Sequence, residues 1–429
     1  PIEEYARQVS LSPELPRNVL VPAFNPETLK MELRPASALI KHIAHQDAFE
    51  LKLRYGRSVK VTGDHSVFVK DADGLPVARP VREIRIGDYV AIPAFLPVVE
   101  QDRTHLDLAA EFLARAESDE DLWRYAVRHP AISEEVERRR EVLHELLERS
   151  GRYIGSRRLR NTVVCTTRKW IRNGTIPLYA VRYSGITVPD NAEFGLYGDS
   201  AGWFPNRIPV TEDLLWLFGF YLAEGAEYGK GGRYFISMSS DEIYLRRAKK
   251  IFETQFNTKV GYAPPTSGRA PEVYVHSSVL HKVFATILRL RDRRIPAWVM
   301  QLPLERVKHF LEGFRCGDGT HSGKKVGNEL VFDTTREELA IDLNFLLLRF
   351  GVIASFGRYE TTFRKKYGDR RFPFFRLTIC ELDDFDILSW DKGVRQTLNA
   401  TRAGDLVWSL VKEINPCLIT SNVFDFSVP

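Results

Sequence analysis

The spacing of hydrophobic positions changes along this chain, from every second residue near both ends to every third or fourth residue in the middle. Apolar and polar residues alternate over 49–54 and 58–62, and turn residues separate the short apolar runs. Strands are therefore predicted at 19–24, 49–54, 58–62, 67–69, 81–84, 89–92 and 422–428. This pattern predicts an all-β module over residues 1–95 and a further strand at the end of the chain.

Helical spacing follows Pro97. It predicts helices over 104–117 and 120–128, and a third from an N-cap at Ser133 to Gly151. Residues 184–210 are rich in Gly, Pro, Asn and Ser, which favours a linker.

Two segments of nine residues are imperfect copies of each other. Residues 217–225 read LFGFYLAEG and residues 311–319 read LEGFRCGDG, so the acids Glu224 and Asp318 are 94 residues apart. A strand, a polar cap and an amphipathic helix follow each copy, and the caps at Ser240 and Thr335 are offset by 95 residues. Because the offset extends over several elements, it indicates a duplicated unit.

Small residues four positions apart occur in both copies, as Gly219 with Ala223 and Gly313 with Gly317. They would leave one face of each helix nearly flat, so that two such helices pack with their backbones close together. The glycine after each acid, at 225 and 319, is expected to end its helix in the left-handed conformation.

Glu224 and Asp318 would then lie at the same end of the packed pair. Two neighbouring carboxylates at helix C-termini repel each other and the helix dipoles, and a divalent cation would relieve that repulsion. Oxygen ligands suit Mg²⁺, and metal ions often bridge the attacking and leaving oxygens in phosphodiester hydrolysis.

The composition is that of an ordinary globular protein, with 429 residues, 44% hydrophobic and 27% charged. No apolar run approaches the length of a membrane span, no signal peptide is visible, and four cysteines are scattered without metal-ligand spacing. We therefore expect a cytoplasmic protein. The net charge of +5 is less informative than its concentration between residues 152 and 177.

That basic stretch predicts a helix–turn–helix, with helices at 154–159 and 166–172, whose second helix enters a DNA major groove. Trp170 and Ile171 would face its core, and a solvated basic helix pair is the alternative. The residues expected to bind DNA are Arg157, Arg158, Arg160, Arg168, Lys169 and Arg172.

The duplicated motif resembles the two LAGLIDADG motifs of a monomeric homing endonuclease, over roughly residues 211–390. The resemblance implies a pseudo-two-fold αββαββα domain, Mg²⁺-dependent cleavage of both strands of double-stranded DNA, and Glu224 and Asp318 as metal ligands. A Lys before the Ile-Pro pair is common in intein-embedded members, whereas this chain has Arg294. Lys324 and Lys325 are possible substitutes for that Lys.

Residues 59–69 with 81–90, and residues 423–429, resemble conserved blocks of inteins of archaeal type, which have the Hint self-splicing fold. The resemblance implies that Thr62 and His65 polarise the scissile amide for an acyl shift, and that Asp425 assists ester formation or cleavage. A histidine titrates near neutral pH, which suits protonation of a leaving amine. The expected Cys or Ser before Pro1 and the closing His-Asn are absent, so the chain as given should not splice.

The sequence therefore predicts a multi-domain α+β protein. Residues 1–95 and 405–429 form the Hint module, joined to host exteins in a precursor. Residues 98–183 form a helical DNA-recognition region, 184–210 a linker, and 211–400 the endonuclease, with repeats at 211–300 and 301–395. Two alternatives are a degenerate intein that keeps only the nuclease, and a LAGLIDADG and helix–turn–helix protein that binds DNA without cutting it.

Overall fold

The computed structural model describes residues 19–43, 46–116, 118–151, 159–198, 202–230, 233–288, 294–322, 329–362, 370–379, 401–419 and 422–428. Within the chain are two compact units. We call Pro1–Gln101 with Asp318–Pro429 the terminal unit, and Asp102–Gly317 the central unit. None of the helices in the described ranges is long and apolar enough to cross a membrane.

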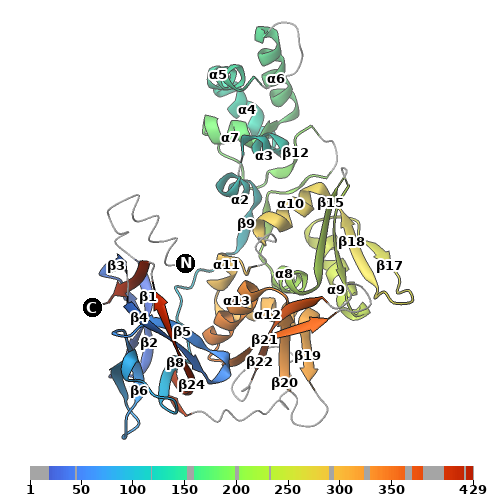
Figure 1. Ribbon diagram of the computed structural model, residues 1–429. Helices are drawn as coiled ribbons and strands as arrows, with labels where there is room; N and C mark the ends of the chain where they lie inside the picture. Colours follow the sequence, from blue (N-terminus) through green and yellow to red (C-terminus); the bar gives the residue numbers. More distant parts are fainter. Residues whose placement is uncertain are drawn as a thin grey trace. The chain divides into compact units, whose positions relative to one another are not determined.

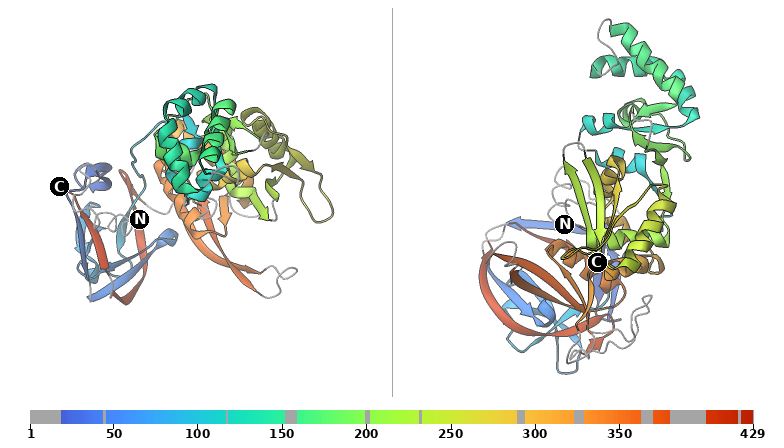
Figure 2. Two further views of the ribbon diagram at one scale, coloured as in Figure 1. Left: turned by 90° about the horizontal axis from the view of Figure 1, so that it is seen from above. Right: turned by 90° about the vertical axis from the view of Figure 1, so that its right-hand side faces the viewer.

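One sheet of the terminal unit combines strands from both ends of the chain. Its order is β5-β4-β24-β8-β6-β7, with β23 paired to β24. Strand β24 pairs with β8 through its first half and with β4 through its second half, and both views in Figure 2 show it among the N-terminal strands. The bounds are β4 Gln46–Leu53, β5 Ser58–Thr62, β6 Ser66–Lys70, β7 Pro76–Pro80, β8 Tyr89–Pro93, β23 Arg402–Ala403 and β24 Leu406–Ile419.

Two smaller sheets of this unit pair β1 (Leu20–Asn25) with β2 (Lys30–Pro35), and β3 (Ala38–Ile43) with β25 (Asn422–Ser427). The 3₁₀ turn η1 covers Arg54–Gly56 and η2 covers Val81–Glu83. The strand predicted over 81–84 is wrong. Val81 and Ile84 are both buried, and a 3₁₀ turn places residues three apart on one side, whereas a strand would place them on opposite faces.

The two copies of the repeated motif begin two sheets with the same strand order. In the central unit the order is β15-β16-β18-β17, and in the terminal unit it is β19-β20-β22-β21 (Figure 1). The first repeat comprises α8 Glu212–Glu224, β15 Gly225–Lys230, β16 Arg233–Ser239, α9 Glu242–Gln255, β17 Gly261–Ala263, β18 Glu272–His276 and α10 Ser278–Ile287. The second comprises α12 Leu304–Asp318, β19 Gly319–Ser322, β20 Glu329–Thr334, α13 Glu337–Arg349, β21 Ala354–Thr362 and β22 Arg371–Ile379. The short helix α11 covers Ala297–Met300.

The second repeat shares a hydrophobic core with the sheet made from both chain ends. Leu348 and Ile353 are buried in one cluster with Leu51, Val90 and Val407. The Leu96 amide also donates to the Leu348 carbonyl oxygen at 3.1 Å. Burial of apolar surface is the main stabilising contribution to a core, so the two parts of the terminal unit stabilise each other.

The rest of the central unit is mostly helical (Figure 1). Its elements are β9 His105–Asp107, α2 Leu108–Arg115, α3 Asp119–Arg124, β10 Tyr125–Arg128, α4 Pro130–Arg138, α5 Arg140–Ser150, α6 Leu159–Asn173, β11 Thr175–Pro177, α7 Leu178–Ser184, β12 Glu193–Leu196, β13 Phe204–Pro205 and β14 Arg207–Pro209.

Several predictions in this region need correction. The expected linker contains strands β12, β13 and β14; β12 pairs with β10 and β14 with β9, which are both far away in sequence. Tyr125–Arg128 was expected to be helical but forms β10, the strand between β11 and β12. The third predicted helix begins at Pro130, with His129 as its N-cap, and it breaks at Arg139. Gly151 does end it in the left-handed conformation, with φ 64°.

Candidate functional site

Helices α8 and α12 meet through their glycines. A Cβ atom added to Gly219 would overlap the Phe310 carbonyl oxygen, and one added to Gly313 would overlap the Trp216 carbonyl oxygen. Only a residue without a side chain allows that approach, so the predicted contact between the helix backbones is confirmed.

The same contact extends toward the acidic end of α8. A Cβ atom on Gly317 would lie 2.9 Å from Cγ of Glu224, and it would overlap the Cβ of Ala223. Glu224 is the last residue of α8, and Asp318, which follows Gly317 directly, is the last residue of α12. Both acids are half-buried.

The helix ends themselves differ from the prediction. Gly225 has an extended backbone, with φ −74° and ψ 137°, and is the first residue of β15. Gly319 likewise begins β19. The chain turns directly from helix to strand at Gly225, where a Cβ atom would overlap the Tyr221 carbonyl oxygen. Glycine is thus favoured at 225 by close packing, while a left-handed cap is absent there.

The environment of Glu224 disfavours its charged form. Burial raises the pKa of the Glu224 carboxyl, and the nearby Asp241 raises it further. The register of the β15–β16 hairpin pairs Gly225 with Met238, which returns the chain to the end of α8 and explains why Asp241 is close. Asp241 is the N-cap of α9 but its side chain makes no capping hydrogen bond. Sequence analysis missed this acid, because its position beside Glu224 depends on the register of the hairpin.

These residues fit a hard divalent cation. Neighbouring carboxylates that are partly removed from water are stabilised by a metal with oxygen ligands, such as Mg²⁺ or Ca²⁺. Across the described ranges, no group of three or more His, Cys, Asp or Glu side chains is assembled as a metal cage. The neighbouring carboxylates of Glu224 and Asp241 would therefore need further oxygen ligands, such as water, to complete a metal's shell.

Of the three basic candidates, the structure describes Arg294. Arg294 is half-buried and precedes Ile295 and Pro296, which lead into α11. Lys324 and Lys325 lie outside the described residues.

The splicing candidates Thr62 and His65 lie in one tight turn. Thr62 ends β5, and the His65 amide donates to its carbonyl oxygen at 3.1 Å. The Gly63 amide donates to the Asp47 carbonyl oxygen at 3.0 Å, and Val81 donates to that of His65 at 2.9 Å. The backbone of the turn is therefore anchored on two sides, while the His65 side chain remains exposed.

Asp425 lies in a different sheet of the same unit. It is on β25, opposite Ile40 of β3, and is exposed. Its carboxylate accepts from the Phe426 amide at 2.8 Å.

The basic stretch does not contain the predicted break. Residues 159–173 form the continuous helix α6, which runs through the break expected between 159 and 166; the rest of the first expected helix, 154–158, lies outside the described residues. Val163 and Trp170 are buried along it, and α6 packs on α4 and α5. Arg168 and Arg172 are exposed and Lys169 is half-buried, as expected for a basic outer face. Arg157, Arg158 and the Arg160 side chain lie outside the described part.

A protein-family model described as an intein splicing domain matches residues 17–429, and the chain therefore belongs to the intein splicing-domain family. It is similar to the DNA polymerase II large subunit of Thermococcus kodakarensis, 26% identical over 364 residues and 82% of this chain. A DNA polymerase of the same organism is 25% identical over 412 residues and 83% of this chain. The chain spans only 18% and 23% of the lengths of these relatives.

Two kinds of solved structure are also similar to parts of the chain. The homing endonuclease I-DmoI, in complex with DNA and Mn, is 18% identical, with a TM-score of 0.32; the match covers 42% of this chain and 99% of that one. A transcription factor IIB mini-intein is 24% identical, with a TM-score of 0.20, over 21% of this chain and 58% of that one.

Proposed function

We propose that this chain is an intein that carries a LAGLIDADG homing endonuclease. The contact of α8 with α12 through glycine backbones carries the proposal, because it packs together two motif copies that each end in an acid. The endonuclease occupies about residues 211–400. The splicing module comprises 1–95 and 405–429, since β24 and β25 pair with N-terminal strands.

The proposed chemistry is hydrolysis of both strands of double-stranded DNA with Mg²⁺. Glu224 and Asp318 would hold the metal, and the bound Mg²⁺ would stabilise charge on the phosphate oxygens. Arg294 would stabilise developing negative charge; a guanidinium remains protonated and so would not act as a base. The two repeats share one strand order, which supports a pseudo-two-fold domain within a monomeric enzyme.

A cleavage assay tests the nuclease. The substrate is a plasmid that carries the host gene without the segment that codes for this chain. The two parts of the gene that normally flank that segment are joined directly. We expect linear product with Mg²⁺ and none with EDTA, and Glu224→Gln and Asp318→Asn should abolish cleavage. The matched control is Glu212→Gln, which removes an exposed acid at the other end of α8.

Retention of cleavage in both acid variants would contradict the proposed metal ligands. An intact plasmid, bound equally with Mg²⁺ and with EDTA, would instead support the non-cleaving DNA-binding alternative. Arg294→Gln should slow cleavage while leaving DNA binding in a gel-shift assay unchanged.

The basic outer face of α6 is the proposed second DNA contact. Arg168 and Arg172 would neutralise backbone phosphates, so the double variant Arg168→Gln/Arg172→Gln should weaken duplex binding and lower its salt dependence. An unchanged salt dependence would favour the alternative, in which these basic side chains are only solvated and do not bind DNA.

The splicing module would act in a precursor with flanking exteins. Thr62 and His65 would polarise the first scissile amide, and Asp425 would assist ester formation or cleavage. In a precursor with restored junction residues, we expect His65→Ala to block ligation of the exteins, whereas Lys60→Ala on the neighbouring exposed strand should not. Absence of spliced product in the unmutated precursor would support a degenerate intein.

A further inference from the structure

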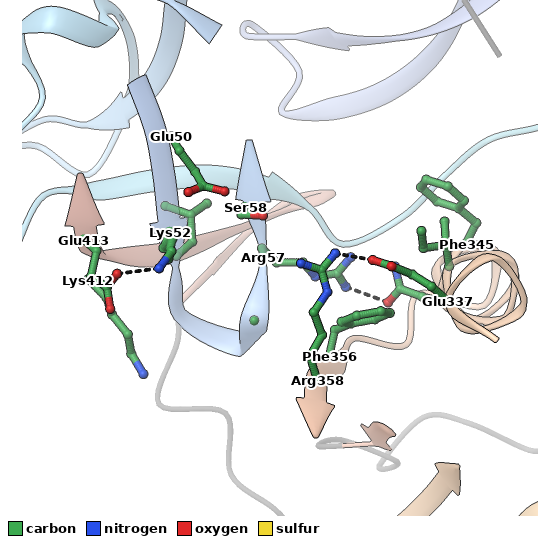
Figure 3. A pocket seen from close by; sticks show the side chains of 14 residues that line it. Glu50, Lys52, Arg57, Ser58, Glu337, Phe345, Phe356, Arg358, Lys412 and Glu413 are labelled. Carbon is green, nitrogen blue, oxygen red and sulfur yellow. Dashed lines mark hydrogen bonds and ion pairs between the residues drawn. The ribbon is translucent and has the colours of Figure 1, made fainter. Parts of the chain in front are cut away.

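A cavity of about 570 Å³ opens in the terminal unit, beside the turn between β4 and β5. Its walls come from that turn, from α13, from β21 and from β24 (Figure 3). The turn is tightly seated, because a Cβ atom on Gly56 would overlap the Phe356 carbonyl oxygen and Gly56 has φ +68°. The cavity is therefore formed by segments held in fixed contact.

Arg57 is a largely buried cation in this wall. Its guanidinium donates to Asn344 Oδ1 at 2.8 Å and to the Ala354 carbonyl oxygen at 3.4 Å, both neutral acceptors. Its Nε is buried and has no acceptor among the residues that the structure describes. Burial lowers the pKa of Arg57 to about 10, and no carboxylate offsets that shift. A buried charge without a counter-ion is unfavourable, and an anion would relieve the cost.

A second guanidinium points to the same helix. Figure 3 shows Arg57, from the turn before β5, and Arg358, from β21, both directed toward α13. Arg358 pairs there with the carboxylate of Glu337. Two guanidinium groups thus face α13 next to one carboxylate.

The other charged residues that line the cavity do not cancel this excess of positive charge. Lys52 pairs with Glu413 at 2.7 Å and also faces Glu50. The cationic lining residues are Lys52, Arg57, Arg358 and Lys412, and the acidic ones are Glu50, Glu337 and Glu413. The lining therefore carries one excess positive charge.

We propose that this cavity binds a phosphate group between Arg57 and Arg358. Guanidinium groups bind phosphate oxygens through paired, charge-assisted hydrogen bonds. The excess positive charge of the lining favours an anion such as a phosphate group. Phe345 on the cavity wall is 42% exposed and offers an aromatic surface to a nucleobase. The phosphate comes either from a free nucleotide or from a DNA backbone.

Titration calorimetry on the full chain at constant ionic strength tests the proposal with two ligands. The first ligand is AMP, and the second is a short duplex of unrelated sequence without terminal phosphates. The variants are Arg57→Gln and Arg358→Gln, compared with Arg246→Gln. Arg246 is a matched control because it is also exposed and paired with a glutamate, at the start of α9.

We expect at least one ligand to bind about tenfold more weakly to Arg358→Gln and Arg57→Gln than to Arg246→Gln, the size expected for loss of a charged hydrogen-bond pair. A difference with AMP assigns a free nucleotide, and a difference with the duplex alone assigns a DNA backbone. Equal affinities in all three variants for both ligands would overturn the proposal and leave Arg57 as a bridge to Asn344. Because Arg358 is exposed, its variant tests the proposal even if Arg57→Gln unfolds. Neither titration measures DNA cleavage, so the result is independent of the proposed nuclease activity.

Discussion

Replacing Gly313 by alanine tests the close approach of α8 and α12. In an exposed helix this change stabilises by about 1 kcal/mol, because alanine has the higher helix propensity. Here the added Cβ would lie 2.9 Å from the Phe220 amide nitrogen, against ordinary contacts that begin at 3.4 Å, and still closer to the Trp216 carbonyl oxygen. Both obstacles are backbone atoms, so the clash cannot be relieved by rotation of a side chain.

The helices must therefore move apart over a contact that buries Trp216, Phe220 and Phe314. Overpacking of a core costs about 1–3 kcal/mol, and the loss of contacts along the separated helices adds to it. We expect a net loss of about 3 kcal/mol, which exceeds the gain from helix propensity. In a protein with two compact units, hydrogen exchange of single helices is a clearer measure than one global midpoint.

Hydrogen–deuterium exchange of the peptide 212–224 measures the effect. A loss of 3 kcal/mol would raise its exchange about 100-fold where opening is in equilibrium. The control pair Lys250→Gly and Lys250→Ala, at an exposed position of α9, measures helix propensity alone. Unchanged or slower exchange of α8 in Gly313→Ala would refute close packing as the reason for this glycine.

Three further outcomes follow from the structure. Because the pKa of Glu224 is raised in the folded protein, its ionisation disfavours folding. Without metal, stability should fall as pH rises from the ordinary glutamate pKa through the raised value, and Glu224→Gln should reduce this dependence in pH-resolved unfolding. Leu348→Ala should cost about 2–4 kcal/mol in denaturant unfolding of the terminal unit, and the exposed Phe345→Ala should cost less. Tyr197→Phe removes the acceptor of the buried Trp170 indole N–H, at 2.7 Å, and should lower the melting temperature by an amount that corresponds to about 1–2 kcal/mol.

The repeat could be predicted because it depends on local patterns. The strand predicted after each motif copy became β16 or β20, and the cap and helix after it became the start and body of α9 or α13. The glycines of both motifs also indicated the helix contact, since few other reasons favour small residues at that spacing. The position of Asp241 beside Glu224 could not be predicted in this way, because it depends on the register of a hairpin.

Elsewhere tertiary contacts override local preference. Residues 160–165 contain two valines and a threonine, which favour helices weakly, yet α6 continues through them because Val163 packs in a buried core. Tyr125, Ala126 and Val127 have no strand pattern of their own, but all three are buried in the strand between β11 and β12. Their conformation is set by neighbours distant in sequence.

The sequence by itself determined the elements whose causes are local: the period of the apolar positions, the caps and the two motifs that end in Glu224 and Asp318. Tertiary structure alone decided the conformation of Gly225, the raised pKa of Glu224 and the cavity around Arg57. It also decided that Leu348, in the second repeat, completes the core of a sheet built from both chain ends. These features depend on contacts between segments that are distant in sequence. Burial of a side chain and steric clashes between backbones arise only when the folded chain brings those segments together.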